Sequence, residues 1–86
     1  MNGTKDVDSG NWQAEALNSI EPIVVDFWHE QCRWCKRLDP ELREIAKQFS
    51  RKAMFVRFNI LSNPRNTLLA HKYGVTSTPM LVMFCR

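Results

Sequence analysis

A short apolar run followed by two closely spaced cysteines occupies residues 23–36, which read IVVDFWHEQCRWCK. The run at residues 23–28 is β-branched and nearly unbroken, which is typical of a buried strand. Over residues 33–49, charged side chains fill the gaps between apolar ones spaced three or four apart, which predicts an amphipathic helix. The apolar positions are Cys35, Leu38, Leu42, Ile45 and Phe49. Because Pro40 removes a backbone donor inside this helix, we expect a kink near Arg37 and not two helices.

The residues that follow predict three more elements. Residues 53–58 form a second apolar run, and strand, helix and strand in this order make a right-handed crossover with parallel strands. Asn63 with the proline after it predicts the cap and first turn of a helix over roughly residues 64–73, and the next glycine predicts its end. The apolar residues 80–84 then predict another buried strand.

The segment before the first strand carries weaker signals. Residues 1–10 are polar and are expected to be a flexible N-terminus, so the predicted domain covers residues 11–86. Asn11 is a suitable cap for a short helix that Pro22 prevents from continuing. Three apolar side chains would share one side of that helix: Trp12, Ala16 and Ile20.

Length, composition and charge exclude several classes of protein. A chain of 86 residues has room for one domain, and its 44% apolar and 24% charged residues are ordinary for a globular fold. No secretory signal or membrane-spanning apolar run is present, and three cysteines do not form a disulfide framework, so we expect a cytoplasmic protein. The net charge of +3 comes from cations that alternate with carboxylates, so neither nucleic acid nor a membrane is an expected partner.

The two cysteines lie where the first strand gives way to the helix. Unpaired N–H groups at a helix start favour a thiolate, so Cys32 is the predicted nucleophile, more exposed than its neighbour. Cys35 is one turn further on and in line with the apolar stripe, so it is the predicted resolving thiol. This spacing predicts thiol–disulfide exchange.

A carboxylate stands inside the apolar strand at Asp26. Burial disfavours its charged form, and the residue is therefore a candidate general base that takes the proton of Cys35. The alternative is a carboxylate satisfied by a cation such as Arg57 on the neighbouring strand, and both roles can coexist.

A pair of cysteines at this spacing also suits half of a zinc site, which needs four ligands. The remaining candidates are Cys85, His29 and His71, and none of them is paired in the sequence. The strand–helix–strand context favours the redox interpretation, with no metal and no cofactor besides a Cys32–Cys35 disulfide. A metal site that bridges two chains stays open. Cys85 is interpreted as an inert apolar residue, or as the source of an intermolecular disulfide.

Several motifs are spread over residues 12–84. They are VDFW at 25–28, CxxCK at 32–36, a proline at 40, RFNI at 57–60 and YGVTSTP at 73–79. Together they resemble the thioredoxin family. The resemblance implies an α/β fold, a three-layer sandwich with a central mixed sheet and helices on both faces.

The same resemblance implies roles for single residues. Cys32, Cys35 and Asp26 correspond to the nucleophile, the resolving thiol and the buried base. Pro79 corresponds to a cis-proline that faces the thiols, with the backbone of Thr78 pairing with an extended substrate. Trp28 would shield the site, or pack in the core.

The sequence departs from the family in two places. Arg33 and Trp34 replace the usual Gly-Pro between the cysteines, and Arg33 favours the thiolate, which predicts a reduction potential above the value of about −270 mV for thioredoxin. Together with Arg57, these residues are the expected redox-tuning set. The family fold also continues beyond residues 80–84 with a strand and a helix, so we expect a C-terminally truncated version whose apolar edge strand supports self-association.

These observations favour a thioredoxin-like enzyme, a thiol:disulfide oxidoreductase that exchanges or reduces protein disulfides. Its expected partners are protein disulfide substrates and an upstream disulfide reductase. A non-catalytic binding module that recruits a partner by strand addition is one alternative, and a metal–thiolate carrier is another.

Overall fold

The apolar run before the cysteines forms strand β2 (Ile23–Trp28), which lies inside a four-stranded sheet of order β1-β3-β2-β4. This computed structural model describes residues 4–85. Strand β3 (Met54–Asn59) runs parallel to β2, and β4 (Met80–Phe84) runs antiparallel to it on the other side. Strand β1 (Lys5–Val7) pairs with β3 in parallel. The predicted mixed sheet is therefore confirmed.

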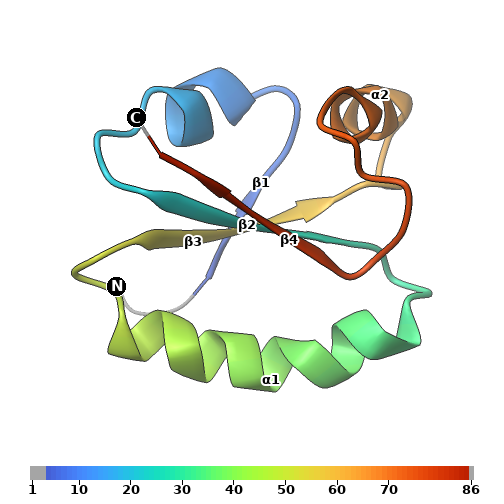
Figure 1. The fold of residues 1–86 in the computed structure, drawn as a ribbon. Coiled ribbons are helices and arrows are strands. Elements are labelled where there is room, and N and C mark those ends of the chain that lie inside the picture. Colours follow the sequence, from blue (N-terminus) through green and yellow to red (C-terminus); the bar gives the residue numbers. More distant parts are fainter. Residues whose placement is uncertain (1–3, 86) are drawn as a thin grey trace.

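Helices cover both faces of this sheet, as Figure 1 shows. Helix α1 (Arg33–Gln48) lies under one face, and α2 (Pro64–Lys72) lies over the other with the short π-helical segment η1 (Gln13–Leu17). The three-layer architecture is confirmed. Helix α1 continues through Pro40 as one helix, as predicted, and the kink stays a prediction.

Neighbouring side chains of a strand point to opposite faces of the sheet, so the core has two parts. On the α2 side, β2 and β3 bury a cluster with the indole of Trp12, and its strand members are Ile23, Val25, Phe27, Val56 and Phe58. On the α1 side, a smaller cluster contains Leu42, Ala46 and Phe55. The odd-numbered side chains of β2 therefore face α2, while the even-numbered ones, including Asp26, face α1.

The N-terminal predictions were partly wrong. Residues 5–7 pair with β3 and Val7 is buried, so the sheet begins inside the segment that we expected to be flexible. Residues 1–3 of that segment lie outside the described residues. Asn11 does not cap η1, because its side chain accepts a hydrogen bond from Asp8 N and the capping position is Trp12. Ile20 is 87% exposed and takes no part in the buried side of η1.

The predicted apolar stripe of α1 is correct in the first half of the helix and wrong in the second. Cys35 and Leu42 are buried and Leu38 packs beside Leu42, as expected, but Ile45 and Phe49 are exposed. Ala46 faces the sheet in their place. Because the side chains of a helix repeat every 3.6 residues, the spacing from Cys35 to Leu42 and Ala46 places Asp39 on the same face.

Strand β4 lies at the sheet edge, as predicted, but it is only half buried. Met80, Val82 and Phe84 pack against the α2-side core, while Leu81 and Met83 are 47% and 60% exposed. Those two side chains point to the α1 side, since neighbours in a strand point to opposite faces. Among residues 4–85, no helix is long and apolar enough to cross a membrane.

Candidate active site

A disulfide joins Cys32 to Cys35 at the start of α1. Cys32 is the residue that caps the helix, and its sulfur accepts a hydrogen bond from Cys35 N at 3.1 Å. One free N–H group of the first turn therefore points at the Cys32 sulfur, and such a donor favours a thiolate there. Cys32 and Cys35 are 7% and 3% exposed. Cys35 is the more buried of the two, as expected, and both sulfurs are largely covered in this disulfide-bonded form.

The residues between the two cysteines point outward. Arg33 is exposed, and Trp34 is 63% exposed with the guanidinium of Arg37 at 5.4 Å from its ring centroid. The first turn of α1 contains no acidic residue. Cations at this end of a helix are unfavourable to the helix dipole but favourable to a thiolate at its cap.

The loop before β4 reaches the same end of α1. The Thr78–Pro79 peptide bond is cis, as the resemblance implied, while the expectation that Pro79 faces the thiols stays a prediction. Pro79 lines a cavity of about 390 Å³ with Trp34, Arg37, Leu38 and Glu41, so this loop and the first turns of α1 form one surface. Thr78 and Pro79 are both partly buried.

Asp26 is 1% exposed and lies on the α1 side of β2. Burial raises the pKa of its carboxyl from 3.8 to about 6, against the lowering effect of the Arg57 charge and with a smaller raising effect from Asp39. Its Oδ1 is buried and has no hydrogen-bond partner among the described residues. Most of this carboxyl is therefore ionised at neutral pH, although ionisation is costly.

Arg57 does not form the ion pair with Asp26 that we considered. Its guanidinium lies 4.0 Å from the centroid of the Trp28 ring, and its Nε lies 3.3 Å from Asp39 Oδ1. A longer contact of 3.7 Å joins its NH1 to Asp6 Oδ1. Trp28 therefore covers the cation from one side, while its role in shielding the thiols stays a prediction.

Asp39 is a member of this cluster that we did not single out from the sequence. Its side chain is 22% exposed and also accepts from Arg43 Nε at 2.8 Å. The signal that could have identified it is its position four residues after Cys35, on the face that carries Leu42 and Ala46.

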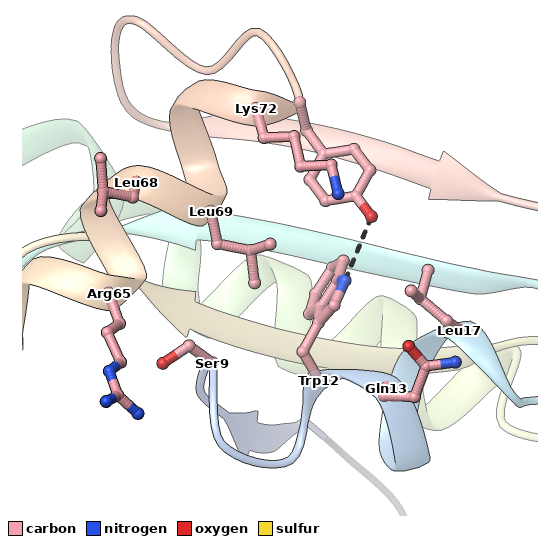
Figure 2. A pocket seen from close by; sticks show the side chains of 9 residues that line it. Ser9, Trp12, Gln13, Leu17, Arg65, Leu68, Leu69 and Lys72 are labelled. Carbon is pink, nitrogen blue, oxygen red and sulfur yellow. Dashed lines mark hydrogen bonds between the residues drawn. The ribbon is translucent and has the colours of Figure 1, made fainter.

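A second depression has a volume of about 430 Å³, and Figure 2 shows the side chains that line it. They come from the η1 region, from α2 and from Tyr73, whose hydroxyl accepts a hydrogen bond from Trp12 Nε1 at 3.3 Å. None of its lining residues comes from α1 or β4. This depression is therefore separate from the candidate active site.

The remaining metal-ligating side chains are dispersed. Within residues 4–85, no group of three or more His, Cys, Asp or Glu side chains is placed to hold a metal ion. Cys85 is a free thiol and is exposed, so our interpretation of it as a buried apolar residue is wrong.

Comparison with known sequences agrees with this geometry. The sequence model of the family described as Thioredoxin matches residues 3–86. The "Thioredoxin M-type, chloroplastic" of Brassica napus is 36% identical over 80 residues, which are 93% of this chain and 44% of that protein. The "Thioredoxin" of Buchnera aphidicola is 39% identical over 84 residues, which are 98% of this chain and 75% of that protein. The "Thioredoxin 1" of Nostoc sp. is 34% identical over 84 residues, with shares of 98% and 76%. The chain belongs to the thioredoxin family.

Proposed function

We propose that this chain is a thiol:disulfide oxidoreductase that reduces or exchanges disulfides in other proteins. The observation that carries the proposal is the Cys32–Cys35 disulfide at the start of α1, where one sulfur caps the helix and the other lies one turn deeper. Family membership supports the same chemistry.

The reaction begins with Cys32 as a thiolate. It attacks one sulfur of a substrate disulfide, a mixed disulfide forms, and the first substrate sulfur leaves as a thiolate that takes a proton from water. Cys35 then attacks the Cys32 sulfur, and the second substrate thiolate leaves. The substrate gains two electrons, and the cysteine pair loses two and becomes the disulfide. An upstream dithiol reductase, the second proposed partner, returns two electrons to the pair.

Asp26 is the proposed general base of the second step. Its carboxylate accepts the proton of the Cys35 thiol, which creates the attacking thiolate. The raised pKa of about 6 supports this role, because a carboxylate with such a pKa is a stronger base than an exposed one and is still mostly ionised at pH 7. The backbone of Thr78, before the cis-Pro79, is the proposed contact for an extended substrate segment.

Arg33 is expected to set the reduction potential above about −270 mV, because a cation near Cys32 stabilises the reduced thiolate form. Replacing it in Arg33→Gln should lower the potential by about 10–20 mV, the equivalent of one exposed charge at a helix start. The measurement is tryptophan fluorescence of the protein equilibrated in thiol buffers. Lys47→Gln, at the far end of α1, is the matched control and should leave the potential unchanged.

Two results would contradict these statements. A wild-type potential at or below about −270 mV would remove the proposed effect of Arg33. A chain that forms no intramolecular disulfide at any buffer potential would overturn the oxidoreductase proposal itself.

A strand-addition module is the second candidate, and one observation favours it. Among the described residues, the outer edge of β4 pairs with no other strand, and Leu81 and Met83 are exposed beside it. An unpaired apolar edge accepts another strand, either from a partner or from a second copy of this chain.

A reducing compartment such as the cytoplasm is the location that fits the proposed oxidoreductase chemistry.

A further inference from the structure

Arg57 occupies the position from which it could neutralise Asp26. The two residues are direct partners in the parallel pairing of β2 with β3, and both side chains lie on the α1 face of the sheet. A guanidinium next to a buried carboxylate normally forms a charge-assisted pair. No ion pair with Asp26 occurs among the described residues, so another interaction holds Arg57 away from it.

The competing contacts come from three elements. Asp39 Oδ1 on α1 lies 3.3 Å from Arg57 Nε, an ion pair that lacks hydrogen-bond geometry. Trp28 on β2 lies beneath the guanidinium at 4.0 Å, and Asp6 on β1 contacts it at 3.7 Å. Asp39 is the stronger of the two carboxylate partners, because its side chain is 22% exposed while that of Asp6 is 79% exposed.

Two charged groups act on Asp26, the cation of Arg57 on β3 and the anion of Asp39 on α1, and these two groups contact each other. The partner of Asp26 on β4 is the apolar Leu81. Arg43 also pairs with Asp39, from a more exposed position on α1.

We propose that Asp39 is a positioning residue: by pairing with Arg57, it holds that guanidinium between α1 and Trp28 and prevents it from pairing with Asp26. The proposal rests on the role of Asp26 as the base of the oxidoreductase. Asp39, a residue of α1, thereby controls the proton affinity of Asp26.

Asp39 keeps the pKa of Asp26 high in two ways. Its own negative charge raises the pKa of Asp26, and its hold on Arg57 limits the lowering effect of that cation. Without Asp39, Arg57 would be free to approach Asp26 and stabilise its ionised form. Asp26 would then be a weaker base toward the thiol of Cys35.

The test compares Asp39→Asn with Glu44→Gln. The first variant removes the proposed interaction with little change of shape, and the second removes an exposed charge from the same helix. The titration of the Asp26 carboxyl is followed by carbon-13 NMR in the oxidised protein. We expect the midpoint in Asp39→Asn to fall by about one pH unit, as for a carboxyl that gains a cation and loses a neighbouring anion. Glu44→Gln should leave the midpoint in place, and equal shifts in the two variants would overturn the proposal.

A second readout reports the position of Arg57 directly. Its side-chain N–H resonance should be displaced by the ring current of Trp28 in the wild type, and that displacement should be lost in Asp39→Asn. An unchanged resonance would mean that Asp39 does not hold the guanidinium. Both readouts use the oxidised protein without substrate, so a chain that lacked oxidoreductase activity would refute the proposed function and leave this test intact.

Discussion

Cys35→Ser is expected to stop turnover and to leave the protein joined covalently to its substrate. Cys32 keeps its place at the helix cap, so the first attack and the mixed disulfide are preserved. The second attack cannot occur within the protein, because its nucleophile, the Cys35 sulfur, is absent. An external thiol must then release the substrate. Because well-placed intramolecular groups have effective molarities far above those of free thiols, turnover should fall by at least about 1,000-fold. The measurement is the rate of reduction of a peptide disulfide, with mass spectrometry of the trapped complex.

Two other cysteine variants complete this experiment. Cys32→Ser should abolish both turnover and trapping, since Cys35 lies one helical turn deeper and is the more buried of the two sulfurs. Cys85→Ser is the matched control, because Cys85 is a free, exposed thiol outside the disulfide, and it should retain the wild-type rate. A trapped complex with Cys32→Ser, or full turnover with Cys35→Ser, would contradict the order of the two attacks.

Much of the architecture could be predicted because strong local patterns coincide with the elements. The bounds of β2 and β4 agree with the apolar runs, and α2 begins at the proline that follows its Asn63 cap. The cysteine pair was identifiable because its chemistry depends on a spacing of three residues at a strand-to-helix junction. For these elements and for the cysteine pair, the local sequence is sufficient for a correct prediction.

The wrong predictions concern segments whose structure depends on tertiary contacts. Strand β1 has three residues, and only the pairing with β3 identifies it. Helix α1 buries Ala46 and leaves Ile45 exposed, because a helix with apolar residues at several three- and four-residue spacings has more than one possible buried face. The contacts of Arg57 join it to residues of three other elements, so no pattern in the local sequence could show them.

The buried carboxyl of Asp26 should lower the stability of this fold at neutral and alkaline pH but not in acid. The pKa of Asp26 is raised from 3.8 to about 6 on folding, so between these values the native state binds a proton that the unfolded chain has released. Stability contributed by the protonated group is complete below about pH 4 and is lost as the pH rises through about 6. A difference of about two pKa units corresponds to about 3 kcal/mol.

Asp26→Asn removes this dependence with little change of shape, and urea unfolding of both oxidised proteins at acidic and alkaline pH measures it. The gain in unfolding free energy of the variant over wild type should be about 3 kcal/mol larger at pH 8 than below pH 4. Comparing the two pH values cancels the hydrogen-bonding effects of the amide, which do not titrate. An equal difference at both would show that Asp26 ionises without cost in the native state. That result would also contradict the proposal that Asp26 is an unusually strong base. The free energy that destabilises its carboxylate in the native state is the same free energy that raises its proton affinity.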